Sequence, residues 1–236
     1  MFTSGHFIWL GVLGALIVLG ILLSKKLNAS QKTVERTVLF LLVPLKLFHV
    51  CLSMKASADG GLVIDQTQLS FQLCSIMIYC VILINFIKSE KVLSVMKSFM
   101  APCLLIGAFM ALLIPTEGVD PAVPRVWQYM LIHGTLVFFG FYLMLIEKVD
   151  LTFRAFLNNL KLLALVVIFG FLMNSVLEQY NTNFLFLRKP PMDGLPVLNL
   201  DNGWYVYFVI LALVACTLLF LVQLPFIIKG ARKKQK

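Results

Sequence analysis

The chain has 236 residues, of which 60% are hydrophobic and only 13% are charged. Soluble domains are about half apolar and about one quarter charged, so this composition excludes an ordinary soluble fold and predicts an integral membrane protein. The formal net charge of +9 does not indicate a nucleic-acid partner, because the basic residues lie mainly in short connections between apolar runs. The five cysteines lie in apolar stretches without a CxxC spacing, so we expect neither a disulfide framework nor a metal site.

Seven apolar runs are long enough, or nearly so, to cross a bilayer as helices, which takes about 20 residues each. The first run has no basic segment before it and no small-residue cleavage site after it, so we expect a retained span. The sequence therefore predicts an all-α, polytopic protein with one seven-helix transmembrane domain over residues 1–236, ending in a basic tail over residues 229–236. The predicted spans are Phe7–Leu23, Thr37–Met54, Leu69–Ile87, Phe99–Pro115, Val126–Ile146, Leu162–Leu177 and Tyr205–Ile228.

The connections between these runs alternate in charge. Fifteen Lys and Arg residues lie in the first, third and fifth connections and in the tail, and four lie in the other connections. Because cytoplasmic loops are enriched in basic residues, this bias predicts an N-terminus outside and a C-terminus in the cytoplasm. Short basic inner loops also favour anionic lipid headgroups as neighbours. We therefore expect a multi-pass protein of the cell membrane whose partners are membrane lipids.

Polar side chains within the runs fall mainly in the predicted outer leaflet. At a rise of about 1.5 Å per residue, Cys74 and His49 lie roughly 9 Å below the outer surface and His133 roughly 12 Å. The predicted inner half contains mainly Asn85 and Gln223. This asymmetry predicts a polar cavity that opens in the outer leaflet. Its candidate lining residues are His6, His49, Gln72, Cys74, His133 and Asn174.

Each of these residues also has a simpler interpretation. A lone membrane histidine can hydrogen-bond a neighbouring helix, and a lone membrane cysteine usually packs as a small hydrophobic residue. Lys46 lies one helical turn from His49 and could snorkel towards a surface. Alternatively it is a buried charge with a carboxylate partner, for which we expect Glu117 or Glu178.

A cysteine and a histidine from different helices can together perform nucleophilic catalysis. The imidazole takes the thiol proton, and the thiolate attacks an ester carbonyl to form a thioester. Either Gln72 or Asn174 could donate a hydrogen bond to the developing oxyanion. The natural ester substrates in a membrane leaflet are phospholipids, and this chemistry requires no cofactor and no metal.

Several short segments, in a fixed order and spacing, carry a family resemblance. They are Ser4–His6, Gln72–Ser75, Gly107–Pro115, Tyr129–His133, Asn183–Pro191, Gly203–Tyr205 and Leu224–Phe226. Over nearly the whole chain they resemble the YwaF-like family of bacterial integral membrane proteins, most specifically in the segment Asn183–Pro191. The resemblance implies a multi-pass protein of the bacterial plasma membrane.

The animal relatives of that family include a transmembrane acyltransferase that acts on ether phospholipids. The resemblance implies a cysteine nucleophile at Cys74 and a histidine partner at His133. The relative's motif is similar to Pro-Leu-His-Leu-Cys, whereas this chain lacks the proline and has Gln72 in place of the histidine. A neutral amide can orient or donate but cannot act as a base.

The leading hypothesis is therefore an enzyme that transfers or hydrolyses a phospholipid acyl group at the outer leaflet, through Cys74 and His133. A second hypothesis is a non-enzymatic binding or transport subunit, with a polar ligand held by Lys46, His49 and Glu178. A structural or assembly partner is a third possibility, and the oligomeric state is open. Residues expected to bind substrate or support the site are Gln72, Asn174, His49, His6, Lys46 and Asn183.

Overall fold

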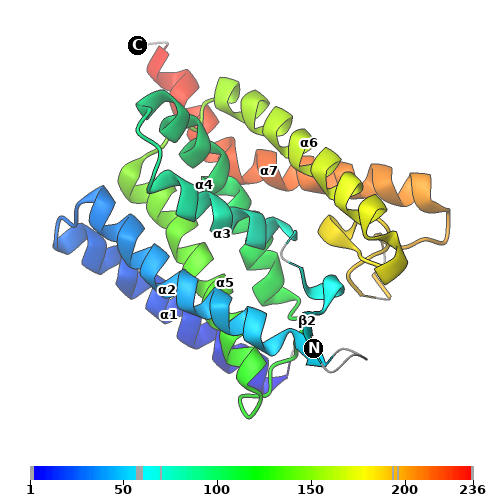
Figure 1. Cartoon of the computed structure of the whole chain (residues 1–236). Coiled ribbons are helices and arrows are strands. Elements are labelled where there is room, and N and C mark those ends of the chain that lie inside the picture. Colours follow the sequence, from blue (N-terminus) through cyan, green and yellow to red (C-terminus); the bar gives the residue numbers. More distant parts are fainter. Residues whose placement is uncertain (1–2, 57–60, 70, 193, 196, 235–236) are drawn as a thin grey trace. The chain divides into compact units, whose positions relative to one another are not determined.

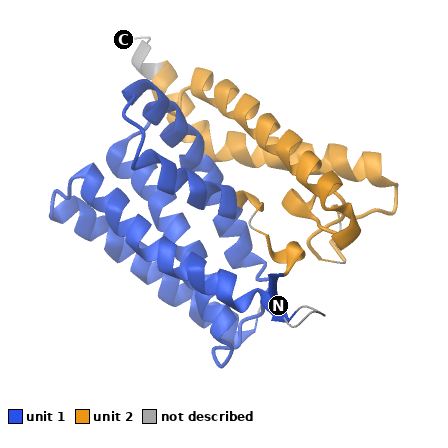
Figure 2. Cartoon of the chain, in the orientation of Figure 1, with its two compact units in different colours: residues 1–64, 74–150 blue, residues 65–73, 151–236 orange. Residues whose placement is uncertain are grey.

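The computed structural model describes residues 3–56, 61–69, 71–192, 194–195 and 197–234. Residues 57–60 of a predicted outer loop and residues 235–236 of the predicted tail lie outside the described residues. The chain divides into two compact units, shown in Figure 2. Unit 1 combines residues 1–64 with 74–150, and unit 2 combines residues 65–73 with 151–236. The single seven-helix domain stays a prediction.

Unit 1 is a helical bundle with one small hairpin (Figure 1). The hairpin pairs strands β1 (Met54–Ala56) and β2 (Leu62–Ile64) in antiparallel register. Its helices are α1 (Ser4–Lys26), α2 (Gln31–Leu52), α3 (Leu73–Ile84), α4 (Glu90–Leu113) and α5 (Pro124–Tyr142), and α5 continues as the π-helical turn η2 (Leu143–Glu147).

The core of unit 1 lies around α5, which packs against α1, α2 and α4. In the apolar stretch of 18 residues that makes each helix long enough to span a membrane, 56% of α4 is buried, and 61% of α5 together with η2. Small residues permit this close packing. A Cβ added at Gly140 would lie 3.2 Å from the Ala101 carbonyl oxygen of α4, and one at Gly134 would lie 2.9 Å from Leu13 of α1. The helices around α5 therefore approach it more closely than larger residues would allow.

Unit 2 is built on α6 (Phe153–Val176) and α7 (Trp204–Lys234), which pack against each other. Thr152 caps the start of α6 by accepting a hydrogen bond from the backbone N–H of Ala155. The buried amides of Asn159 and Gln223 join the two helices at 3.2 Å. Short 3₁₀ turns complete the unit: η1 (Gln66–Gln68), η3 (Glu178–Tyr180) and η4 (Phe184–Phe186).

Five helices in the described part of the chain are long and apolar enough to cross a membrane: α1, α4, α5 with η2, α6, and α7 as far as Ala231. In α1, α6 and α7, less than a fifth of the corresponding apolar stretch is buried. Such large exposed apolar surfaces are unfavourable in water and suit contact with lipid. The protein is thus a multi-pass helical membrane protein.

The second and third predicted spans differ from the helices observed. The second corresponds to α2, whose 22 residues include Lys32, Glu35 and Arg36 near its start and Lys46 in its second half. The third corresponds to α3, which has only 12 residues instead of the run Leu69–Ile87. A helix of that length rises about 18 Å and is shorter than the roughly 30 Å of hydrocarbon. It starts late because the residues just before it belong to unit 2, where Gln72 binds another segment.

Candidate functional site

Cys74 and His133 belong to one group of side chains in unit 1. The Lys46 amine of α2 donates to the Ser75 hydroxyl of α3 at 3.4 Å. Lys46 also acts electrostatically on both Cys74 and His133. His49 also lies near His133, and Tyr129 lies near Cys74. We call Lys46, His49, Cys74, Tyr129 and His133 the thiol–imidazole cluster.

The imidazole of His133 has a defined orientation. Its Nδ1 lies 2.7 Å from the backbone oxygen of Tyr129, one helical turn earlier in α5. A carbonyl can only accept, so Nδ1 carries the hydrogen and Nε2 keeps the lone pair of the neutral ring. The Tyr129 ring packs against it with centroids 4.2 Å apart. Cys74 and His133 are both described residues, and no hydrogen bond joins them.

The expected carboxylate partner of Lys46 was a wrong prediction. Glu117 forms an ion pair with Arg125 at 2.9 Å, and Glu178 forms one with Arg188 at 2.6 Å. Each carboxylate has an arginine nearby in the sequence, and a guanidinium binds a carboxylate with better geometry than an ammonium does. Lys46, which is half-buried, therefore has the Ser75 hydroxyl as its hydrogen-bond partner.

Two other candidate histidines also lie in unit 1. His6 is fully buried, and its Nε2 donates to the Leu112 carbonyl oxygen at 2.8 Å. This hydrogen bond joins the start of α1 to the end of α4. His49 lies one turn after Lys46 in α2, and its backbone oxygen accepts from the Ser53 hydroxyl at 2.8 Å. His6 thus has a helix-joining hydrogen bond, while His49 belongs to the thiol–imidazole cluster through its proximity to His133.

Gln72 and Asn174 lie in unit 2, where both amides bind the same loop. Gln72 donates to the Asn183 carbonyl at 3.1 Å and accepts from the Leu185 N–H at 2.8 Å. Asn174 donates to the Phe184 carbonyl at 3.0 Å and accepts from the Phe184 N–H at 2.8 Å. Each side chain therefore engages one N–H and one carbonyl in or just before the distorted 3₁₀ turn η4.

Asn183 holds the other end of this loop. Its side-chain oxygen accepts from the backbone N–H groups of Arg188 and Lys189 at 3.0 and 3.2 Å, and its amide donates to the Lys189 carbonyl at 2.9 Å. Leu185 and Phe186 have φ angles of +56° and +55°, which side-chain-bearing residues rarely adopt. We call residues 183–189 the clamped loop, because surrounding hydrogen bonds hold this strained backbone.

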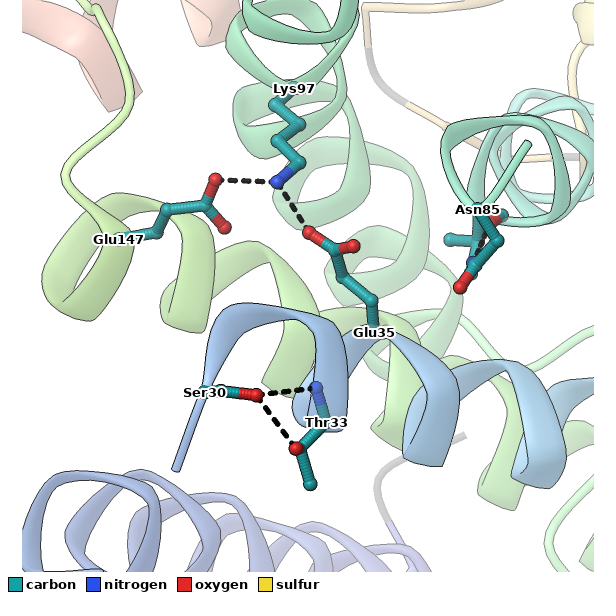
Figure 3. A network of polar contacts seen from close by, with 7 residues as sticks. Ser30, Thr33, Glu35, Asn85, Lys97 and Glu147 are labelled. Atoms are coloured by element: carbon teal, nitrogen blue, oxygen red, sulfur yellow. Dashed lines mark hydrogen bonds and ion pairs between the residues drawn. The ribbon is translucent and has the colours of Figure 1, made fainter. Parts of the chain in front are cut away.

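A buried ionic triad was missed by the sequence prediction. Lys97 is only 4% exposed; its amine donates to Glu147 at 2.7 Å and also contacts Glu35 (Figure 3). We expected Lys97 in an inner connection, but α4 begins at Glu90 and so places Lys97 inside a helix. The available signal was that Glu35 and Glu147 border two predicted spans, on the same predicted side as Lys97.

Neither a metal centre nor a disulfide is seen in the described residues. They contain no group of three His, Cys, Asp or Glu side chains placed to hold a metal ion. All five cysteines are free, and Cys103 alone among them is classed as buried. The side chains of the thiol–imidazole cluster supply a thiol, two imidazoles, a phenol and an amine.

Comparison with known proteins gives one match. The model of the TMEM164 family matches residues 1–223, which cover unit 1, most of unit 2 and every candidate site residue. No curated protein and no solved structure matches the chain. The match supports a membrane family of this kind, whereas the YwaF name and a bacterial source are not part of it.

Proposed function

The chain belongs to the TMEM164 family of membrane proteins, and on that premise we propose that it is a lipid-acyl enzyme embedded in the membrane. It transfers a fatty acyl group from one phospholipid to a second acceptor, or to water. Cys74 is the nucleophile and His133 the base. The observation that carries this proposal is the thiol–imidazole cluster in unit 1. The association of the family with lipid acyltransferase-like function supports it.

The proposed reaction follows from the orientation of His133. Its Nε2 takes the proton of the Cys74 thiol, and the sulfur attacks the ester carbonyl carbon of a phospholipid. The carbon–oxygen ester bond then breaks, and the imidazolium returns the proton to the departing lysophospholipid oxygen. An acceptor hydroxyl loses its proton to Nε2 and attacks the thioester. This step forms the new ester and regenerates the thiol; with water as acceptor the product is a fatty acid.

Lys46 and Tyr129 support this reaction in different ways. The positive charge of Lys46 stabilises a thiolate at Cys74 more effectively in an apolar surrounding than it would in water. The Tyr129 carbonyl holds the His133 ring so that the lone pair stays on Nε2, which is the role of the orienting residue in catalytic triads. We assign His49 a supporting position beside His133. Gln72, Asn174 and Asn183 support the clamped loop.

The proposal includes a topology with seven crossings, the N-terminus outside the cell and the chemistry in the outer leaflet of the cell membrane. The charge bias of the connections supports this orientation. α3 is too short to cross alone, so we assign the third crossing to α3 together with residues 65–72. Non-helical backbone is tolerated at membrane depth where protein surrounds it. The resemblance to YwaF-like proteins favours a bacterial plasma membrane.

The test is acyl exchange between phospholipids in proteoliposomes. Cys74→Ala and His133→Ala are each expected to abolish exchange, because they remove the nucleophile and the base. The matched control is Cys80→Ala, which removes a second half-buried thiol of α3 and is expected to keep full activity. Full activity of Cys74→Ala would overturn the mechanism.

Labelling separates this function from a non-enzymatic binding or transport subunit. A lipid-like electrophile is expected to modify Cys74 in preference to the other four cysteines. The protein is labelled intact, and the modified cysteines are then identified by mass spectrometry of its peptides. The Lys46→Met variant should react more slowly at Cys74 because it removes the nearby positive charge. Equal labelling of the five cysteines would favour the non-enzymatic alternative.

A further inference from the structure

We propose that a cavity beside the clamped loop binds the phosphodiester of a membrane phospholipid, with Arg188 as its phosphate ligand. The cavity lies within unit 2 and has a volume of about 340 Å³. It combines apolar, aromatic and hydrogen-bonding groups. The residues that line it are Phe171, Asn174, Ser175, Leu187, Arg188 and Trp204. The inference concerns lipid binding and stands whether or not Cys74 performs acyl transfer.

The position of the cavity identifies its surroundings. Ser175 lies in the last turn of α6, which ends at Val176, and Trp204 is the first residue of α7. Both helices are long and apolar enough to span a membrane, so the cavity lies at the end of two spans. Tryptophan is enriched at this depth, where lipid headgroups meet the hydrocarbon. A group bound there is therefore at the level of the phosphate of a phospholipid.

The clamped loop forms one wall of the cavity, and many of its backbone N–H and carbonyl groups have hydrogen-bond partners. Besides the amides of Gln72, Asn174 and Asn183, the Trp204 indole donates to the Leu187 carbonyl at 2.8 Å. The Tyr207 hydroxyl donates to the Phe186 carbonyl. Such backbone can lie where water is scarce, because few of its polar groups are left without a partner. The loop is thus a preformed wall that presents the side chain of Arg188.

The chemistry of the wall favours an anion. Arg188 is fixed at its backbone by Asn183, and its guanidinium has five N–H donors. One terminal nitrogen donates to Glu178 at 2.6 Å, and the side chain is still 36% exposed. A guanidinium binds phosphate oxygens in a bidentate manner. The Ser175 hydroxyl offers a further donor to the same cavity.

The apolar part of the cavity favours a lipid over free phosphate. The rings of Phe171 and Trp204 meet edge to face with centroids 6.1 Å apart, and Phe208 stacks on Trp204 at 5.5 Å. Leu187 completes this surface. Inorganic phosphate would gain nothing from such a wall, whereas the glycerol backbone and first acyl carbons of a phospholipid would bury apolar area against it.

The experiment measures binding to the full chain in phosphate-free detergent, by the shift in unfolding temperature with ligand concentration. The three probes are dihexanoylphosphatidylcholine, dihexanoylglycerol and inorganic phosphate. We expect saturable binding of the phospholipid and much weaker binding of the other two. Arg188→Gln should raise the dissociation constant of the phospholipid by at least about tenfold, the range expected for one charge-assisted contact.

Three control variants make the result decisive. Lys189→Gln removes the same charge one residue away, outside the cavity lining, and should leave the affinity unchanged. Glu178→Gln breaks the same ion pair as Arg188→Gln but frees the guanidinium, so affinity should be unchanged or higher. Cys74→Ala should bind normally, which separates this site from the proposed catalysis.

Three outcomes would overturn the proposal. The first is equal weakening in Arg188→Gln and Glu178→Gln, which would make the ion pair purely structural. The second is equal weakening in Arg188→Gln and Lys189→Gln, which would indicate only a general charge effect. The third is inorganic phosphate binding as tightly as the phospholipid, which would identify free phosphate as the ligand.

Discussion

At the scale of single residues, polar side chains in this protein differ in how many of their groups are already engaged. The amides of Gln72 and Asn174 each hold an N–H and a carbonyl of the clamped loop. His6 donates to a carbonyl at the end of α4. His133 donates from Nδ1 to the Tyr129 carbonyl within its own helix, whereas the hydrogen bond of His6 joins two helices. We propose His133 as the base because it, unlike His6, belongs to the thiol–imidazole cluster.

The buried triad gives a prediction about stability. Lys97→Met leaves the carboxylates of Glu35 and Glu147 facing each other without their shared cation. We expect this variant to lose about 3–5 kcal/mol of unfolding free energy, the usual cost of removing one partner from a buried ion pair. The measurement is reversible or kinetic unfolding of the purified protein in detergent, followed by circular dichroism.

The control for this prediction is Lys91→Met, which removes an exposed lysine from the first turns of the same helix. It should cost less than about 0.5 kcal/mol. A triple variant with Lys97→Met, Glu35→Gln and Glu147→Gln should recover much of the loss, since no buried charge remains. Equal stability of Lys97→Met and Lys91→Met would show that the triad contributes nothing to the fold.

At the scale of elements, α5 has the greatest influence on the candidate site. It supplies both His133 and Tyr129, and it packs against α1, α2 and α4 in the centre of unit 1. Beyond Tyr142 it continues as a π-helical turn that ends at Glu147 and is followed by Lys148, whose φ angle is +57°. Glu147 lies in this turn, so one helix carries both a member of the thiol–imidazole cluster and a member of the triad.

The close approach of α4 to α5 is testable with a larger side chain. Gly140→Val adds atoms where a Cβ alone would already lie 3.0 Å from Leu105 and 3.2 Å from the Ala101 carbonyl oxygen. A backbone oxygen cannot rotate away, so we expect a loss of about 1–3 kcal/mol, typical of an overpacked core. Thermal unfolding in detergent measures the effect.

Gly11→Val is the matched control, because a Cβ at Gly11 of α1 meets no atom within 4 Å. Both variants replace glycine by valine within an apolar helix, so their intrinsic helix preferences cancel in the comparison. Gly11→Val should unfold at or above the wild-type temperature. A Gly140→Val protein as stable as Gly11→Val would mean that α4 and α5 do not pack as closely as described.

At the scale of the whole molecule, composition and the length of apolar runs correctly predicted a multi-pass helical membrane protein. The depth argument placed Cys74 and His133 at similar levels below the outer surface, which stays a prediction; in the structure both lie near Lys46. Contacts between distant segments could not be predicted. The pairing of Lys97 with Glu35 and Glu147 depends on helix rotation, which the hydrophobic pattern leaves open when an apolar run is apolar on every face.

The hydrophobic pattern also could not predict where the third helix begins. The run Leu69–Ile87 reads as one helix, because its composition does not reveal that Gln72 binds a loop more than 100 residues later. That pairing satisfies the Gln72 amide outside a helix and places residues 65–73 in unit 2. A hydrophobic run therefore gave the existence of α3 correctly and its start incorrectly.

The orientation of the whole chain is testable by labelling engineered thiols. Asp120→Cys lies in the connection before α5, and Lys25→Cys lies at the end of α1, so the proposed topology places them on opposite sides of the membrane. In intact cells a membrane-impermeant maleimide should label Asp120→Cys, whereas Lys25→Cys should react only after lysis. The variants are compared with the parent chain, because Cys51 and Cys216 are exposed in the structure and set the background.

The reverse labelling pattern would place the predicted outer leaflet, and with it the proposed acyl chemistry, on the cytoplasmic side. Labelling of both positions in intact cells would contradict the odd number of crossings between them.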